Sequence, residues 1–378
     1  ERTATEFRIQ SNNDSGFNWI LGALKETNEK VTDVDYLQPG STNPIFWEAD
    51  LVRKGDIDAI FGEAYFDLSE KTSLTMGLRK YDQTMDLKAS DGYYGSYAFG
   101  INSLDFNSSE TGSIPKLSIS HDISDDIMVY GSYSEGFRPS GVNRPRPSQA
   151  GLIPETYDPD YLDSYEIGVK SSLKDGRLIL NGALYKMDWT DYQTSTYDTD
   201  ITSVAYTENV GNAEINGMEL NLMYAISDTA DMTLYVNKMD PTLSEDYYYT
   251  SGELGADAGN RLAYMPELTY YLSFDKDFVF MGKPAYMNID YSHTGERYTT
   301  YENGGILLPS YSMSNLRAGI DNDNSSIELY VTNLFDKDAY LSRYDDFESV
   351  GSSGYSGFGI RRTGSKPRVI GIRIRYRY

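Results

Sequence analysis

Residues 369–378 read VIGIRIRYRY, and this stretch shows the pattern that decides the fold. Every second side chain is apolar or aromatic: Ile370, Ile372, Ile374, Tyr376 and Tyr378. The positions between them hold Val369, Gly371, Arg373, Arg375 and Arg377. A period of two predicts a β-strand with one apolar and one polar face. If the apolar face contacts lipid, the arginines must face a wet lumen, because arginine at the lipid midplane costs about 2–4 kcal/mol.

The same alternation recurs upstream. Apolar residues at 218, 220 and 222 flank Glu219, those at 327, 329 and 331 flank Glu328, and those at 74, 76 and 78 precede Arg79. In the stretches 57–67 and 178–189, apolar residues occupy both the odd and the even positions. The polar residues that alternate with these apolar ones are predicted to face the lumen: Arg373, Arg375, Arg377, Glu219, Glu328 and Arg79.

The composition excludes several classes of protein. No stretch of the 378 residues approaches the roughly 18 consecutive apolar residues of a membrane helix, whereas barrel strands carry their apolar residues in alternation. The net charge of −24 disfavours a nucleic-acid groove, which needs a basic surface. Without cysteine, thiolate chemistry and disulfides are excluded.

Turn signals divide the chain into strands whose links alternate between short and long. We expect strands near 4–11, 17–26, 56–68, 72–86, 113–123, 127–138, 163–173, 177–190, 207–226, 231–239, 262–275, 283–296, 311–320, 326–336 and 367–378. Short periplasmic turns alternating with long outer loops are typical of an outer-membrane barrel. The fold predicted is an all-β, transmembrane antiparallel β-barrel with about 15 strands in this chain.

An odd strand count has a topological consequence. A barrel threaded from the periplasm begins and ends on that side with an even number of strands, and an open edge cannot face lipid. We therefore expect further strands before Glu1, or strands supplied by another polypeptide.

Several motifs resemble those of a known family. They include PKLSISHDISDDIMVYGSYSEGFRPSGVN at 115–143, YLDSYEIGVKSSLKDGRLILNGALYKMDWTDYQ at 161–193, NVGNAEINGMELNL at 209–222 and LYVTNLFDKDAY at 329–340. With the terminal aromatic residue, they resemble the C-terminal part of the barrel of a TonB-dependent outer-membrane receptor. The resemblance covers essentially the whole chain, 1–378, as one barrel domain.

The resemblance implies a 22-stranded barrel around an N-terminal plug, with the plug and the first strands outside this sequence. It also implies TonB as the energising partner, acting through the missing plug. Gly217 and Gly319 lie on the predicted lumen-facing side of their strands. We expect them to leave room for a neighbour such as the plug, or else to permit local bending of the strand.

No constellation of catalytic or metal-binding residues emerges. The two histidines, His121 and His293, lie in separate predicted strands, which disfavours a metal site or a catalytic triad. The sequence DNDN at 321–324 is interpreted as a turn rather than a calcium loop. The acidic group at 158, 160 and 163 is interpreted as solvated loop residues rather than a calcium site. We predict no enzyme activity, cofactor or resident metal.

Two kinds of outer-loop residues are candidates for ligand binding. Arg138 and Arg144 lie in a basic, proline-rich segment, where a planar guanidinium suits an anionic ligand; the alternative is a rigid loop with exposed arginines. Tyr247, Tyr248 and Tyr301 belong to tyrosine-rich tracts that suit ligand contact or merely cap the outer rim.

The function implied by the resemblance is TonB-dependent uptake of a scarce nutrient across the outer membrane of a Gram-negative bacterium. A ferric siderophore is the expected substrate, with cobalamin, haem or an oligosaccharide as alternatives. Other expected partners are lipopolysaccharide, outer-membrane lipid and a chain or segment that completes the barrel; nucleic acid is not expected. The competing hypotheses are a passive porin-like or structural barrel and a soluble extracellular β-domain.

Overall fold

The computed structural model describes residues 1–376 except 38–39, 41–44, 94–99, 144–150, 152, 197–205, 250–251, 323 and 345–360. Every regular element in the described residues is a β-strand. In that part of the chain, no helix is long and apolar enough to cross a membrane.

Fifteen strands form one antiparallel sheet. In sheet order they are β1 (Arg2–Gln10), β2 (Phe17–Leu37), β3 (Ile45–Ser69), β4 (Thr72–Tyr93), β5 (Gly100–Ser124), β6 (Ile127–Arg138), β9 (Asp160–Leu173), β10 (Leu178–Thr190), β13 (Ala213–Ser227), β14 (Ala230–Leu243), β17 (Leu268–Phe280), β18 (Lys283–Thr294), β21 (Tyr311–Asn322), β22 (Ser325–Thr332) and β25 (Val369–Tyr376). Each strand pairs with its neighbours in this order, so the fifteen predicted strands are confirmed one for one.

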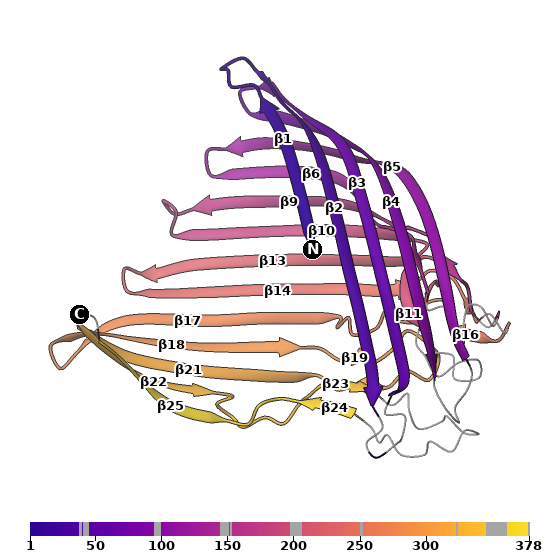
Figure 1. Ribbon diagram of the computed structural model, residues 1–378. Coiled ribbons are helices and arrows are strands. Elements are labelled where there is room, and N and C mark those ends of the chain that lie inside the picture. The colour runs from indigo at the N-terminus through magenta and orange to yellow at the C-terminus, as the bar shows by residue number, and fades with distance from the viewer. Residues whose placement is uncertain are drawn as a thin grey trace.

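The sheet curls into an open trough in which short turns gather at one end and long loops at the other (Figure 1). We call these the turn end and the loop end. Strand β21 ends at Asn322, which pairs with Ser325 at the start of β22, as expected for the predicted turn at 321–324, whose residue 323 lies outside the described residues. The loops contain small hairpins: β7 (Gly141–Val142) with β8 (Thr156–Tyr157), β11 (Gln193–Thr196) with β12 (Tyr206–Asn209), β15 (Tyr247–Tyr248) with β16 (Leu254–Ala256), β19 (Arg297–Tyr298) with β20 (Leu307–Leu308), and β23 (Tyr340–Tyr344) with β24 (Arg361–Gly364).

Several predicted boundaries are wrong. Strands β2 to β5 continue far beyond the others toward the loop end, so much of the predicted loops 26–56 and 87–112 is paired strand. Strand β17 runs on to Phe280 and turns tightly through Met281 and Gly282, both with positive φ, where a longer link was predicted. Residues predicted to begin the strand at 207 form the separate hairpin strand β12 instead.

The pairing of the strands places polar side chains on one face of the sheet and apolar side chains on the other. One face carries Arg79, Lys116, Glu166, Glu219, Glu328 and Arg373, and we call it the polar face. The opposite face carries exposed Leu78, Leu117, Ile167, Met218, Ile327 and Ile372, and we call it the apolar face. Exposed apolar side chains gathered on one face indicate a surface that meets an apolar partner.

Aromatic rings fill the glycine positions of the polar face. Tyr185 lies directly opposite Gly217, and its ring comes within 2.2 Å of where a Cβ on that glycine would stand. Tyr286 covers Gly319 in the same way, at 2.7 Å. These glycines therefore leave room for a neighbour, as expected, and that neighbour is the ring of a cross-strand tyrosine.

Candidate functional site

A groove of about 620 Å³ lies on the polar face. Its polar lining comes from seven neighbouring strands and includes Tyr130, Glu166, Lys170, Asn181, Glu219, Asn221, Tyr235, Asn237, Tyr271 and Ser292. These hydroxyl, amide and carboxylate groups can hydrogen-bond to polar solutes, and Val169, Leu220, Val236 and His293 also line the groove.

Tyrosines fix the wall of the groove by reaching across strands. The Tyr130 hydroxyl donates to Glu166 and its ring lies over Gly168, while Lys170 Nζ stands 5.2 Å from the ring centroid. The Tyr185 hydroxyl donates to Asn237 Oδ1 at 3.0 Å, two strands away. These contacts hold each ring flat against the sheet, so the groove is preorganised.

The groove also offers an acceptor that the wall does not use. Asn221 Oδ1 has no hydrogen-bond partner among the described residues, although the residue lines the groove. A buried polar atom without a partner costs free energy. A donor group on a solute in the groove would recover that cost.

A second pocket of about 540 Å³ continues the polar face toward β25. It shares Ser292 and Thr294 with the groove and is also lined by Asn315, Asn333 and Lys366. Asn333 has a positive φ and donates to the carbonyls of Lys337 and Lys366, both at 2.9 Å, which ties the loop after β22 to the start of β25. The two cavities form one polar tract from β6 to β25.

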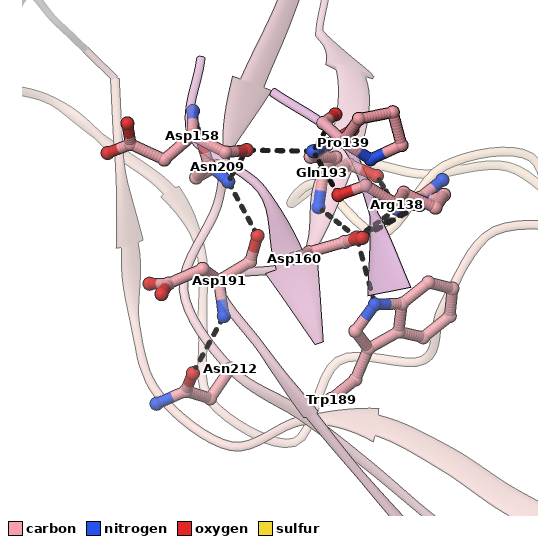
Figure 2. Close-up of polar contacts among 9 residues, drawn as sticks. All are labelled: Arg138, Pro139, Asp158, Asp160, Trp189, Asp191, Gln193, Asn209 and Asn212. Atoms are coloured by element: carbon pink, nitrogen blue, oxygen red, sulfur yellow. Dashed lines mark hydrogen bonds and ion pairs between the residues drawn. The ribbon is translucent and has the colours of Figure 1, made fainter. Parts of the chain in front are cut away.

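At the loop end, the buried carboxylate of Asp160 in β9 contacts residues of three other strands, β6, β10 and β11 (Figure 2). Asp160 is 1% exposed and accepts hydrogen bonds from Arg138 Nε at 3.0 Å, Trp189 Nε1 at 2.9 Å and the Gln193 backbone N–H at 3.0 Å. The Arg138 guanidinium also donates to the Gln193 carbonyl and lies 4.9 Å from the Trp189 ring centroid. Hydrogen bonding to Asp160 raises the pKa of Arg138.

Amide side chains extend this cluster into the neighbouring loops, as Figure 2 shows. The Gln193 amide donates to the carbonyls of Pro139 and Asp158, at 2.9 and 2.7 Å. Asn209 donates to the carbonyls of Asp158 and Asp191, at 3.0 and 2.7 Å. The cluster therefore fixes the loop after β6 and the hairpin β11–β12 relative to each other.

A second loop-end cluster is formed by tyrosines. Tyr247 is 5% exposed and donates to Glu208, and its ring meets Tyr301 edge-on with centroids 5.8 Å apart. Tyr301 is 2% exposed and its hydroxyl is 2.9 Å from the Thr196 hydroxyl. Burial raises the pKa of both phenols, so they stay neutral hydrogen-bonding groups at any physiological pH.

The structure separates the predicted ligand-binding residues. Tyr247 and Tyr301 come together inside the second cluster, whereas Tyr248 is 56% exposed. Arg138 is engaged by Asp160, and Arg144 lies outside the described residues. Ligand contact by these five residues stays a prediction.

The predicted lumen-facing residues share one face as far as the structure describes them. Arg373 pairs with Glu328 at 2.6 Å, and Arg375 follows at the next position of the same parity. Glu219 lines the groove, Arg79 lies on the same face, and Arg377 lies outside the described residues. That this face borders a lumen stays a prediction.

Sequence reasoning missed the role of Asp160. It was interpreted as one of three solvated loop acids, and that interpretation is wrong, because the carboxylate is buried against Arg138. No group of metal-binding side chains occurs in the described part of the chain. The useful signal was Arg138, a basic residue in a strongly acidic chain, because an arginine that packs against neighbouring strands pairs favourably with a carboxylate.

Comparisons with known proteins agree on one family. The family model described as TonB dependent receptor-like, beta-barrel matches residues 2–334. The chain is 23% identical over 336 residues to the metal-pseudopaline receptor CntO of Pseudomonas aeruginosa, a match covering 86% of this chain and 44% of that protein. It is 25% identical over 234 residues to the ferrichrome outer membrane transporter/phage receptor of Escherichia coli, covering 58% of this chain and 28% of that one.

Solved structures show the same fold. The ferric yersiniabactin uptake receptor FyuA from Yersinia pestis superposes with a TM-score of 0.79 at 16% identity, over 99% of this chain and 54% of that one. The copper transporter OprC gives a TM-score of 0.70 at 14% identity, over 99% and 56% of the two chains. The present chain thus spans less than half the length of the sequence relatives and about half that of the structural ones.

Proposed function

The chain belongs to the family of TonB-dependent receptor β-barrels, and we propose that it forms part of the wall of a transporter that takes up a ferric siderophore. Barrels of this family lie in the outer membranes of Gram-negative bacteria. The observation that carries the proposal is the polar tract of two joined cavities on a sheet whose other face is apolar. Such a wall borders a wet path through a membrane.

The chemistry of the tract suits passage rather than reaction. Ferric siderophores present many oxygen atoms and amide groups, and the hydroxyl and amide groups of the tract exchange hydrogen bonds with such solutes. Related proteins are receptors and transporters rather than enzymes. The barrel would therefore shape the path, and the work of opening it would come from elsewhere.

Completion of the barrel belongs to the same proposal. Fifteen strands cover about half of each structural relative, and β1 and β25 stand at the two ends of the sheet order. We propose a barrel of about 22 strands, completed by a preceding segment or a partner chain that also carries the plug. TonB would act through that plug, and lipopolysaccharide and outer-membrane lipid would surround the barrel.

Uptake of radioactive iron tests the function. The full-length gene product is expressed in a bacterium lacking its own siderophore receptors, and cells are offered a panel of iron-loaded siderophores with and without TonB. We expect at least one siderophore to deliver iron only when both the receptor and TonB are present. Uptake that persists without TonB would assign the protein to the passive channels. Failure of every siderophore, with uptake of cobalamin, haem or an oligosaccharide, would overturn the substrate assignment alone.

A further inference from the structure

Positive charge is concentrated in the last part of this acidic chain. Residues 297–378 contain 11 basic and 9 acidic side chains, whereas residues 1–296 contain 22 basic and 48 acidic ones. The net charge of the two parts is therefore +2 and −26. Such an asymmetry within one domain indicates a local preference for an anionic partner.

A buried cation lies at the start of this basic part. Arg297 in β19 is 4% exposed, and its Nη2 donates to the carbonyls of Tyr340 and Leu341, at 2.9 and 2.8 Å. These bonds tie β19 to the neighbouring strand β23 at the loop end (Figure 1). The guanidinium also lies 5.3 Å from the centroid of the Tyr311 ring.

The charge of Arg297 has no counter-charge within the described part of the chain. Its hydrogen bonds go to neutral carbonyl groups, and Nη1 is buried without a hydrogen-bond partner. No carboxylate forms an ion pair with it in the residues that the structure describes. An uncompensated buried charge raises the electrostatic potential around it, because the low dielectric of the interior weakens screening.

The second pocket adjoins this guanidinium. Tyr311, whose ring contacts the guanidinium, and Leu341, whose carbonyl accepts from it, both line the pocket of about 540 Å³. The exposed Lys366 lines it too, and its amine forms no ion pair within the described residues. The remaining lining combines hydroxyl, amide and apolar side chains: Ser292, Thr294, Thr332, Ser365, Asn315, Asn333, Met313 and Val369.

The carboxylates nearest in the fold are engaged elsewhere. Asp290 is 7% exposed and accepts from Asn315 Nδ2 at 2.7 Å. Asp336 accepts from the backbone N–H of Arg368 at 2.8 Å. Neither aspartate lines the second pocket, whose lining contains one cation and no carboxylate among the described residues.

The two cavities of the polar tract therefore differ in charge. The groove between β6 and β18 has Glu166 and Glu219 against the single cation Lys170. The second pocket has Lys366 in its lining and Arg297 behind Tyr311. A volume of about 540 Å³ falls within the range of about 300–1,000 Å³ that holds small-molecule ligands.

We propose that the second pocket binds a free carboxylate group of the iron chelate. Lys366 would contact this group directly, and the buried Arg297 would supply a positive field behind the wall. The inference rests on the proposed function and names its substrate class, an anionic ferric chelate rather than a neutral one. Carboxylate is the favoured group because charge-assisted hydrogen bonds are about twice as strong as neutral ones.

The two cations have different exposure, which gives each a separate signature. Salt screens the interaction of an exposed charge such as Lys366 strongly and that of a buried charge such as Arg297 much less. Arg297 also joins β19 to β23, so loss of its charge must be separated from loss of its hydrogen bonds. R297K keeps the charge and loses the planar fork, whereas R297Q loses the charge and keeps an amide donor.

Binding of two chelates to the detergent-solubilised full-length protein tests the proposal, with affinity read from quenching of tryptophan fluorescence. Ferric citrate serves as the anionic probe and ferrichrome as the neutral one. We expect the wild type to bind ferric citrate at least about 10-fold more tightly than ferrichrome. K366Q should weaken the binding of ferric citrate about 5-fold and R297Q about 10-fold, with little change for ferrichrome.

K337Q is the matched control, because Lys337 lies in the same loop and does not line the pocket. It should leave both affinities within about twofold. Raising the salt concentration should remove most of the effect of K366Q and preserve that of R297Q. R297K should bind ferric citrate about as well as the wild type.

Equal affinity of the wild type for the two chelates, or equal losses in K337Q and K366Q, would overturn the proposal. If R297K lost as much affinity as R297Q, the role of Arg297 as a charge would be refuted. Calorimetry with iron-free citrate separates this site from the proposed function. Binding of citrate that depends on Lys366, together with failed iron uptake, would leave the anion site standing and refute the function; uptake of neutral chelates alone would do the reverse.

Discussion

Replacing Asp160 with asparagine removes the charge at the centre of the first loop-end cluster. The carboxylate accepts hydrogen bonds from Arg138, from the Trp189 indole and from the Gln193 backbone. Asparagine has nearly the same shape but one acceptor fewer and no charge. The variant therefore leaves a guanidinium and one or more N–H donors without their partner.

The cost follows from burial. Removing one partner of a fully buried ion pair destabilises a protein by about 3–5 kcal/mol. The Arg138 side chain is 48% exposed, so water recovers part of its solvation and the estimate falls to about 2–3 kcal/mol. Because the cluster fixes loops rather than the sheet, the loss should appear as local opening of the loop end.

Hydrogen exchange in lipid vesicles measures this local opening. D160N should speed the exchange of amides in 190–196 and 206–212 by about 30- to 150-fold while strands β13 and β17 stay protected. D158N is the matched control, because Asp158 is exposed and contributes only backbone groups to the cluster. Equal exchange in D160N and the wild type would refute the view that Asp160 holds these loops.

Three further changes test the packing and polarity of the sheet. G217A should destabilise the barrel by about 1–3 kcal/mol in guanidinium unfolding, because the new Cβ would meet the Tyr185 ring at 2.2 Å. D50N should slow hydrogen exchange at neutral pH in the loop-end extensions of β2 to β4. Partial loss of hydration and repulsion from Asp33 raise the pKa of Asp50, so its ionisation destabilises this part of the sheet as pH rises. L220R should cost about 2–4 kcal/mol, because residue 220 lies on the apolar face between Met218 and Leu222.

Each of these changes has a neighbour that serves as its control. G182A should be tolerated, since nothing lies closer than 3.7 Å to its Cβ position. D56N removes a carboxylate that faces only Thr27 and Thr84, so it should leave exchange unchanged. N221R places the arginine on the polar face and should cost less than L220R. If control and variant behaved alike in any pair, the corresponding contact would be refuted.

The sequence was sufficient for the number and order of the sheet strands, because alternation is a local property of the chain. It failed where the alternation is interrupted. The predicted end at Glu26 falls in the polar run 25–30, although β2 runs on to Leu37, and β4 likewise continues beyond the predicted end at Asp86 to Tyr93. A strand whose alternation is interrupted resembles a strand that ends.

Contacts between distant segments were beyond the reach of the sequence. Gly217 appeared to offer empty space because its cross-strand partner, Tyr185, lies 32 positions earlier and is fixed only by the register. Asp160 appeared solvated because the burial of a loop carboxylate depends on three segments meeting. Of the candidate ligand residues, sequence spacing alone did not indicate that Tyr247 and Tyr301 pack together.

Spin-label accessibility along β13 tests most directly whether one face of the sheet meets lipid and the other water. Nitroxides are placed one at a time at positions 218 to 223 of the protein in vesicles, and their collisions with oxygen and with a water-soluble nickel complex are compared. We predict a period of two, with oxygen favoured at 218, 220 and 222 and nickel at 219, 221 and 223. Equal access of nickel to all six positions would contradict the membrane-spanning wall.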